Sequence, residues 1–314
     1  MIHIMNTAAG RNLSDKLLEL SQKHCPNVIE EMKGIADGAG IHFDYFWAMT
    51  IKSELGAVQK EPPGCSSIFV KDDKKMWLIH NEDGHADYHD IMFTIKVMPP
   101  SGVSYISLVY PGTVAGGGPS LNNRGIIQTT NYIGSTKCEI GLPRYVIGRT
   151  ILEAKDLQEA IQLATFEPRA YPFHHHLASF DEKKYASLET VPGAFELKVP
   201  SGVYFHTNHL LFEKTKDYQF QVKGHKNGSS HARYTVIKEK LNQTEANNYQ
   251  AERMLSILSS HQRAPYSPCR HPQGNITGST LSTAFFDIIE RRFTLYKGNP
   301  CQAVKNNQVV TLGF

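Results

Sequence analysis

The chain has 314 residues, of which 40% are hydrophobic, and its 33 Lys and Arg nearly balance 30 Asp and Glu to give a formal net charge of +3. This length can bury a large core, and we expect one domain because no linker, repeat or low-complexity tract divides the chain. The lack of a basic block argues against a nucleic-acid partner, and no apolar run approaches the roughly 18 residues of a membrane span.

The first residues, Met1 to Asn6, lack the charged and apolar regions of a secretory signal, so we expect a cytoplasmic protein. The cysteines are odd in number and widely spaced: Cys25, Cys65, Cys138, Cys269 and Cys301. This pattern predicts neither a disulfide framework nor a Cys-x-x-Cys metal site. The run His174-His175-His176 does not predict a metal either, because adjacent residues of a strand point to opposite faces.

Helical and extended patterns occupy separate blocks of the sequence. Apolar residues recur at helical spacing within residues 11–57, and short β-branched or aromatic runs then predict strands at 66–70, 76–80, 91–98, 103–110 and 125–131. Beyond them we expect helices within 145–166, strands at 177–180, 184–189, 195–198 and 203–206, helices near 230–241 and 245–259, and a hairpin from 282–290 and 292–296. Such blocks favour an α+β fold with two stacked, mainly antiparallel sheets between helical layers.

The peptide bond between Gly64 and Cys65 is the first candidate for chemistry. Glu61-Pro62-Pro63-Gly64 breaks regular structure and the apolar run after Ser67 predicts a strand, so Cys65 should sit rigidly at a reachable strand start. We expect the chain to cut itself here. The thiol would attack the Gly64 carbonyl, the amide would shift to a thioester, and water would release the upstream piece.

The cut would give Cys65 a new α-amine, whose ordinary pKa of about 7.7–8.0 lets it take the proton of the thiol. Gly64 suits the cut because it leaves its carbonyl unshielded and tolerates a strained backbone. For an isolated Gly-Cys pair, a buried structural thiol is the alternative interpretation.

Two further segments carry polar residues at the ends of predicted strands. Asn81-Glu82-Asp83 ends the strand after Cys65, and hairpin pairing would return it to Cys65, where a carboxylate can orient the amine or the thiol. His206-Thr207-Asn208-His209 ends another strand, and the Asn208 amide there can donate to the oxyanion of a tetrahedral intermediate. An ordinary turn and a strand-end cap are the alternative interpretations.

Together these segments resemble the acyl-coenzyme A:6-aminopenicillanic acid acyltransferase family of N-terminal-nucleophile hydrolases. The resemblance rests on Pro63-Gly64-Cys65-Ser66-Ser67, Asn81-x-Asp83 and His206-Thr207-Asn208-His209. It continues through Glu31-x-x-Gly34-Ile35-Ala36-x-Gly38-Ala39-Gly40, Gly141-Leu142-Pro143-Arg144, Ser229-Ser230-x-x-Arg233, Thr280-Leu281-Ser282-Thr283 and Gly298-Asn299-Pro300-Cys301. It therefore covers nearly the whole chain.

The resemblance implies a four-layer αββα sandwich, made as a precursor that cuts itself into residues 1–64 and 65–314. Cys65 would be the nucleophile, Asp83 would support processing and orient the site, and Asn208 would form the oxyanion hole. Ser229 and Ser230 would help to shape the site or its maturation. Such an enzyme would need no metal and no cofactor.

The sequence leaves the substrate open. Glu82 stands where relatives often have an aromatic or apolar residue, and its carboxylate either favours a cationic substrate or points to solvent. Arg144 and Arg233 are candidates to bind the charge of an acyl donor, although surface ion pairs are the default interpretation. We expect a small-molecule amide or acyl donor, with acyl-coenzyme A one candidate, and we expect segment 1–64 to stay bound through its apolar helix faces.

Two other functions fit the same residues. An uncut cysteine hydrolase would use a histidine base such as His80, His85 or His209. A binding protein on the same fold would bind a ligand without forming an acyl-enzyme.

Overall fold

The computed structural model describes residues 5, 7–56, 64–100, 102–135, 138–219, 228–244 and 249–314. Its α-helices are α2 (Ala8–His24), α3 (Pro26–Gly38), α4 (Phe43–Thr50), α5 (Arg144–Ile151), α6 (Leu157–Ala164), α7 (Ser229–Asn242), α8 (Ala251–Leu258) and α9 (Pro300–Ala303), and its 3-10 turns are η1 (Ala86–Tyr88) and η2 (Lys216–Tyr218). Its strands are β1 (Cys65–Lys71), β2 (Met76–His85), β3 (Phe93–Val97), β4 (Tyr105–Val109), β5 (Ser120–Asn122), β6 (Ile126–Tyr132), β7 (Phe173–Ser179), β8 (Lys184–Val191), β9 (Ala194–Lys198), β10 (Val203–His206), β11 (Gly278–Asp287), β12 (Arg292–Lys297) and β13 (Val309–Leu312).

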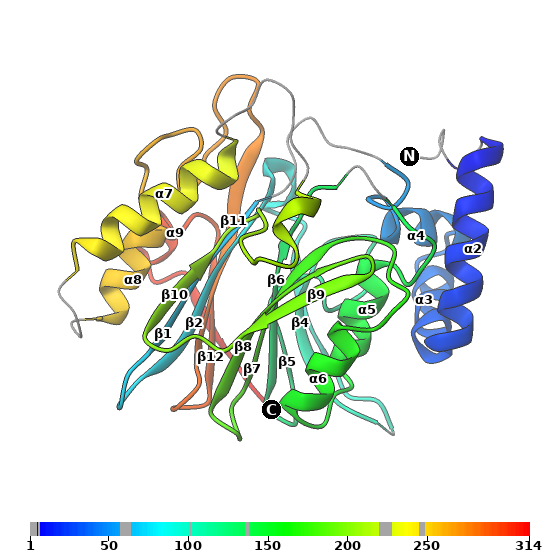
Figure 1. Ribbon diagram of the computed structural model, residues 1–314, viewed down its shortest axis with the longest axis horizontal. Coiled ribbons are helices and arrows are strands. Elements are labelled where there is room, and N and C mark those ends of the chain that lie inside the picture. Colours follow the sequence, from blue (N-terminus) through cyan, green and yellow to red (C-terminus); the bar gives the residue numbers. More distant parts are fainter. Residues whose placement is uncertain are drawn as a thin grey trace.

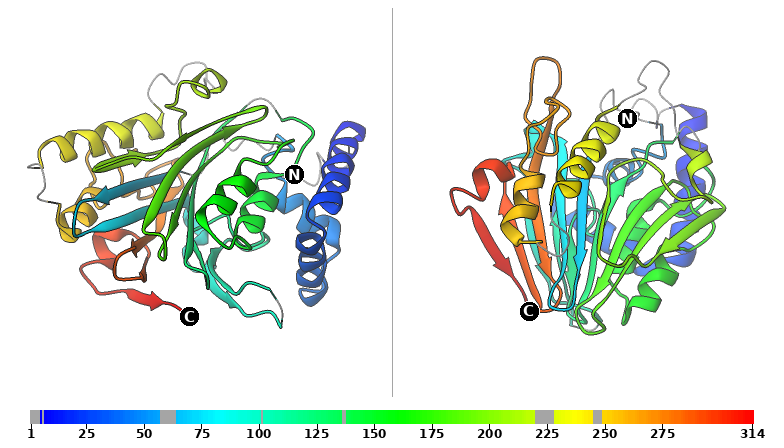
Figure 2. Two further views of the ribbon diagram at one scale, coloured as in Figure 1. Left: turned by 60° about the horizontal axis from the view of Figure 1, so that its bottom comes forward. Right: turned by 60° about the vertical axis from the view of Figure 1, so that its left-hand side comes forward.

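The strands form two sheets that lie face to face (Figure 1). Sheet A has the order β10-β1-β2-β11-β12-β13, and sheet B has the order β3-β4-β5-β6-β7-β8-β9. Neighbouring strands are antiparallel in both sheets. Helices α7, α8 and α9 lie outside sheet A, and α5 and α6, followed by α2, α3 and α4, lie outside sheet B (Figures 1 and 2). The predicted αββα sandwich is therefore confirmed.

Alternation along each strand supplies apolar side chains to three layers of core. Between the sheets, Phe69 of β1 and Leu78 of β2 pack against residues of sheet B, and the rings of Phe69 and Tyr185 stack with centroids 3.8 Å apart. The neighbouring residues Ile68 and Ile79 point the other way and pack under α7 and α8. Each such side chain contributes about 1.5–3 kcal/mol when it is fully buried.

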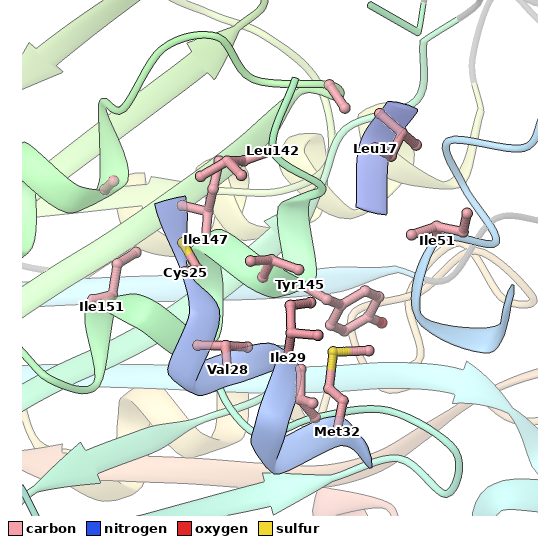
Figure 3. Packing of buried hydrophobic residues seen from close by; sticks show 14 of the residues in the cluster. Leu17, Cys25, Val28, Ile29, Met32, Ile51, Leu142, Tyr145, Ile147 and Ile151 are labelled. Atoms are coloured by element: carbon pink, nitrogen blue, oxygen red, sulfur yellow. The ribbon is translucent and has the colours of Figure 1, made fainter. Parts of the chain in front are cut away.

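The N-terminal helices are anchored by one apolar face. In α3, which starts at Pro26, the buried residues Val28, Ile29 and Met32 recur at helical spacing. They pack against Tyr145 and other residues of α5 and of the preceding loop (Figure 3). This explains the helical pattern predicted within residues 11–57, although residue 57 itself lies outside the described residues.

The structure also has elements that the sequence pattern did not predict. These are β5, β13 and α9, which have three or four residues each and are too short for a recognisable period. Of the helix expected at 245–259, residues 245–248 lie outside the described residues, and α8 begins at Ala251 after the extended N-cap Gln250. The expected break at 61–63 also lies outside the described residues. In the part of the chain that is described, no helix has the length and apolar character of a membrane span.

The hairpin of β1 and β2 positions the residues that the sequence analysis singled out. Its register places Cys65 opposite Glu82 and Ser67 opposite His80. Glu82 shares the pleat of Leu78 and faces the space between the sheets, whereas Asp83 shares the pleat of Ile79 and faces the helices. The two adjacent carboxylates therefore serve opposite sides of sheet A.

The histidine run on β7 alternates as expected. His174 and His176 face the inter-sheet space and both contact Asn131 Oδ1, at 3.2 and 2.8 Å. His175 points to the opposite face, where neither ring nitrogen has a hydrogen-bond partner among the described residues. Burial, with a smaller contribution from Arg169, lowers the pKa of His175 to about 3.

This burial predicts a loss of stability in mild acid. Between pH values of about 3 and 6.5, the unfolded chain binds a proton at His175 that the folded chain does not, so stability falls as pH falls. From about pH 7.5 to about pH 5.5 the wild type should lose about 1.4 kcal/mol more than His175→Phe, by the linkage relation. Urea unfolding of both proteins at the two pH values measures this, and equal losses would contradict it.

Candidate active site

Cys65 begins β1 and borders a pocket. Only 3% of its surface is exposed. The pocket wall is rich in aromatic rings and carries charges of both signs. Its lining residues are Lys52, Cys65, Glu82, Gly84, His85, Tyr88, Tyr110, Gly117, Thr130, Tyr132, Arg144, Tyr145 and Phe173. A small molecule with an apolar or aromatic part and a polar group could therefore reach the thiol.

Asn208 holds the backbone of Cys65. The Cys65 amide donates to Asn208 Oδ1 at 2.8 Å, and Asn208 Nδ2 donates to the carbonyl of Tyr132 at 2.9 Å. An Asn amide has two N–H donors, so the second remains for another acceptor. Asn208 therefore lies beside Cys65. Its role in the oxyanion hole stays a prediction.

Arg233 of α7 lies behind Cys65 and is 1% exposed. It donates to the carbonyl of Cys65, to Ser66 Oγ at 2.9 Å and to Asn208 Oδ1 at 2.7 Å. It is not among the residues that line the pocket. Its contacts make it a residue that positions Cys65 and Asn208, whereas the sequence analysis considered it for substrate binding.

Asp83 contacts the bond before Cys65 through its backbone. Its N–H donates to the Gly64 carbonyl at 2.8 Å, which polarises that carbonyl. Its carboxylate accepts from Thr280 Oγ1 at 2.7 Å, and Oδ2 lies 4.0 Å from Arg233 Nε. Burial raises the pKa of Asp83, against the opposing charges of Arg233 and Arg270.

The approach of these groups explains the glycine before Cys65. A Cβ at position 64 would come within 2.8 Å of Arg233 Nη2 and 3.0 Å of Asp83 Oδ2. Any side chain there would therefore displace one of the two groups that hold this bond.

Glu82 does not point to solvent, since it is 4% exposed. Its Oε1 accepts from the Tyr110 hydroxyl at 2.7 Å and lies 3.9 Å from Cys65 Sγ, and its Oε2 lies 3.2 Å from His80 Nε2. Of the two possibilities open from the sequence, the solvent-facing one is wrong. The carboxylate lines the pocket beside the thiol.

This setting keeps the thiol protonated. Burial raises the pKa of Cys65 well above its ordinary value, and the carboxylates of Glu82 and Asp83 raise it further, while Arg233 opposes them. In the uncut chain, attack by the thiol therefore needs a base that removes its proton.

Ser229 and Ser230 begin α7 and act through other residues. Ser230 Oγ accepts from the backbone N–H of Asn208 at 2.8 Å and lies 2.7 Å from His209 Nδ1. Ser229 Oγ accepts from Arg233 Nε at 3.2 Å. The pair thus supports the two residues that hold Cys65.

Two basic side chains also line the pocket. The guanidinium of Arg144 packs over the rings of Tyr132 and Tyr145, with its Cζ 4.7 and 4.9 Å from their centroids. Lys52 also lines the pocket, and burial, together with the charge of Arg144, lowers its pKa to about 8. The pocket therefore offers one carboxylate and two basic groups.

Sequence reasoning missed Lys52 and Tyr110. Neither lies in a recognisable motif, and both reach the pocket through tertiary packing. The weak signal available for Tyr110 was its place at the end of a predicted strand, beside a glycine-rich loop.

Two groups of side chains among the described residues could hold a metal ion. One is Cys65, His80 and Glu82, whose ligand atoms lie within 4.8 Å of one another. Both oxygens of Glu82 already contact other side chains, namely those of His80 and Tyr110. The other group is His261, Cys269, His271 and Cys301, which lies outside the pocket lining.

Comparisons with known proteins agree with this picture. The family described as "Acyl-coenzyme A:6-aminopenicillanic acid acyl-transferase" matches residues 70–302. The beta-alanyl-dopamine/carcinine hydrolase of Drosophila melanogaster is 22% identical over 351 residues, which cover 93% of this chain and 82% of that protein.

Solved structures show the same fold. Two crystal structures of conjugated bile acid hydrolase variants from Clostridium perfringens each match with a TM-score of 0.51, at 12% and 11% identity. The matches cover 80% and 79% of this chain and 92% of each of those chains. At this identity the likeness concerns the fold alone.

The position of Glu82 predicts how the thiol responds to its removal. Glu82→Gln takes away a negative charge beside Sγ, so the pKa of Cys65 should fall, and alkylation should be severalfold faster at a pH below that pKa. The measurement is the rate of iodoacetamide labelling of the Cys65 peptide, followed by mass spectrometry. Glu213→Gln, at an exposed glutamate, is the control and should label like the wild type. An unchanged rate in Glu82→Gln would refute the electrostatic role.

Proposed function

The chain belongs to the acyl-coenzyme A:6-aminopenicillanic acid acyltransferase family, and we propose that it is a self-processing amidohydrolase or acyltransferase with the Cys65 thiol as its nucleophile. One observation carries the proposal. The Gly64–Cys65 bond is held on both sides, by the Asp83 N–H on the Gly64 carbonyl and by Asn208 on the Cys65 nitrogen, with the thiol beside a pocket. A buried structural thiol would need neither the pocket nor these contacts.

Processing starts from the thiol of the uncut chain. Glu82, whose Oε1 is 3.9 Å from Sγ, takes the thiol proton, and Sγ attacks the Gly64 carbonyl carbon. The Asp83 N–H stabilises the oxyanion that forms on the Gly64 oxygen. The carbon–nitrogen bond then breaks as the Cys65 nitrogen takes the proton that Glu82 accepted, which leaves a thioester and a free α-amine. Water hydrolyses the thioester, so that the Gly64 carboxylate and a Cys65 with free thiol and amine are the products.

Substrate turnover uses the amine released by this cut. The α-amine would remain near Asn208 Oδ1, where the Cys65 nitrogen lies in the uncut chain, and it takes the thiol proton. Sγ then attacks the substrate carbonyl, the leaving group takes the proton, and an acyl-thioester forms. Water or an amine finally takes the acyl group and regenerates the thiol. The second N–H of the Asn208 amide can donate to the oxyanion in both steps.

The pocket supports a substrate class as well as a reaction. We propose small linear amides whose amine part is aromatic and whose acyl part carries an ammonium group. Tyr88 and Tyr110 pack edge to face beside the thiol, and Glu82 offers the counter-charge for an ammonium. The Drosophila relative, named for beta-alanyl-dopamine and carcinine, is consistent with this class. An anionic acyl donor held by Lys52 and Arg144 is the second candidate, because both basic residues line the same pocket.

An uncut cysteine hydrolase is the competing mechanism. A ring nitrogen of His80 lies within 4.8 Å of the Cys65 thiol and contacts Glu82, so His80 is its best base. Burial lowers the pKa of His209 to about 2, which makes that histidine a poor base at neutral pH. His85 lines the pocket and is paired with Asp87.

Self-processing predicts two chains in the purified protein. Intact mass under denaturing conditions should show pieces of residues 1–64 and 65–314, the second beginning with Cys65. Cys65→Ala should remain whole because no nucleophile is left, and Cys65→Ser should be cut more slowly because a hydroxyl is a poorer nucleophile.

Cys138→Ser is the matched control and should be cut like the wild type. Cleavage of Cys65→Ala at the same bond would rule out this thiol as the agent. A whole and active wild type that loses activity in His80→Gln would establish the competing mechanism instead.

The substrate proposal predicts an opposite response to two charge changes. With a β-aminoacyl amide of an aromatic amine, the cut chains of Glu82→Gln should show a KM raised by about tenfold or more, since loss of a partly buried ion pair costs about 1.4 kcal/mol or more. Slower self-cleavage of this variant lowers the amount of active enzyme and does not change KM. Lys52→Met should leave that KM unchanged. With an amide that carries a carboxylate, Lys52→Met should raise KM and Glu82→Gln should leave it unchanged. Steady-state kinetics on both amides measures this, and an unchanged KM for the cationic amide in Glu82→Gln would exclude Glu82 as its binding partner.

A further inference from the structure

Four side chains with metal-binding atoms meet on the helical side of sheet A. His261 follows α8, Cys269 and His271 lie in the connection from α8 to β11, and Cys301 belongs to α9. Each offers one ligand atom, and the four atoms all lie within 4.8 Å of one another. We propose that these residues form a structural zinc site, which the reaction proposed above does not require.

The distances between the ligand atoms fit tetrahedral coordination of one ion. His271 Nε2 lies 3.5 Å from Cys269 Sγ, 3.3 Å from Cys301 Sγ and 3.2 Å from His261 Nε2. With bonds of about 2.3 Å to sulfur and about 2.0–2.1 Å to nitrogen, a tetrahedron around Zn²⁺ has edges of roughly 3.3–3.8 Å. The three distances agree with those edges to within a few tenths of an ångström.

Hydrogen bonding alone does not explain the cluster. A neutral imidazole nitrogen carries either one N–H or one lone pair, directed in the ring plane. His271 Nε2 nevertheless meets three different polar atoms at short range. One ion at the centre would give each of the four atoms a partner.

The ligand set favours zinc among the common metals. Two thiolates and two neutral imidazoles are soft and borderline donors, which suit Zn²⁺ better than Mg²⁺ or Ca²⁺. Four protein ligands leave no open position for water, so the site is structural in character. Cys269 is fully buried, while His261 is exposed, so an ion can enter from the surface.

The backbone around the cluster is already fixed. The Cys269 amide donates to the carbonyl of Ser260, beside His261, at 3.0 Å. Asn299, at the start of α9, donates through Nδ2 to the carbonyl of Arg270 at 2.6 Å. These bonds bring three separate segments together, which lowers the ordering cost of metal binding.

The site would also brace the candidate active site from behind. The Pro268 carbonyl accepts from Asn81 Nδ2 at 3.0 Å, and the Arg270 amide donates to Thr280 Oγ1 at 2.9 Å. Thr280 Oγ1 in turn donates to the Asp83 carboxylate. An ion bound through Cys269 and His271 would hold the segment that carries these contacts.

The test is metal content of the full chain, purified without chelator. The wild type should contain about one zinc ion per chain by elemental analysis, and Cys269→Ser and Cys301→Ser should each lower this content by about tenfold or more. Cys138→Ser, at a half-buried cysteine outside the cluster, is the matched control and should keep its zinc. Retention of zinc in both cluster variants would overturn the proposal, because the ion would then lie elsewhere.

A second measurement needs no variant to fold and no enzyme activity. Co²⁺ added to the wild type, after a chelator has removed zinc and the thiols have been reduced, should produce the thiolate-to-cobalt charge-transfer absorption of a tetrahedral site, and Zn²⁺ should abolish it. Absence of this band in the folded, reduced, zinc-free protein would overturn the proposal. So would a Cys269–Cys301 disulfide, found by mass spectrometry after alkylation of free thiols in unreduced protein.

Discussion

The antiparallel pairing of β1 with β2 fixes where the Cys65 thiol lies relative to two carboxylates. Because side chains alternate across a strand, Glu82 shares the inter-sheet side with the thiol and Asp83 faces the helices. A slip of one residue would exchange these positions, and it would turn Leu78 toward the helices and Ile79 into the core between the sheets. The cores on both sides of sheet A therefore enforce the geometry of the site, and catalytic placement follows from burial of residues such as Leu78 and Ile79.

Burial of so many polar groups constrains the site further. Cys65, Asp83 and Arg233 are almost without solvent contact, and an isolated buried charge would be costly. The polar groups are joined by hydrogen bonds. Arg233 donates to the Asn208 side chain, the Asn208 backbone N–H donates to Ser230, and Thr280 donates to Asp83. Removal of one member leaves its partners unsatisfied, so the effects of single substitutions around Cys65 should not add. The network also holds the Gly64 carbonyl and the Cys65 nitrogen before any reaction occurs, which is the preorganisation that an attack on this bond needs.

Local pattern was enough to predict the layers and the hairpin. Short β-branched and aromatic runs in 66–70 and 76–80, joined by a polar turn, predicted the pairing that brings Asn81-Glu82-Asp83 back to Cys65, and the structure confirms it. Pattern could not show where Glu82 points, because that depends on the Tyr110 hydroxyl, which arrives from sheet B. It also gave no sign that Cys269 and Cys301 lie close together, which happens because the connection after α8 packs against the start of α9. Contacts between distant segments carry no period, so sequence reasoning has no signal for them.

The connection from α8 to β11 links the proposed zinc site to Asp83 of the candidate active site. Asp83 lacks a full complement of partners, since its Oδ2 accepts no hydrogen bond among the described residues. Its Oδ1 depends on Thr280, whose position is set by the backbone of Arg270. Arg270 lies between Cys269 and His271, so any restraint on those two residues also restrains the hydroxyl that holds Asp83. The influence would pass along this chain of hydrogen bonds, from the backbone of Arg270 through Thr280 to the Asp83 carboxylate. An ion bound by Cys269 and His271, on the helical side of sheet A, would in this way help to hold the Asp83 backbone N–H against the Gly64 carbonyl.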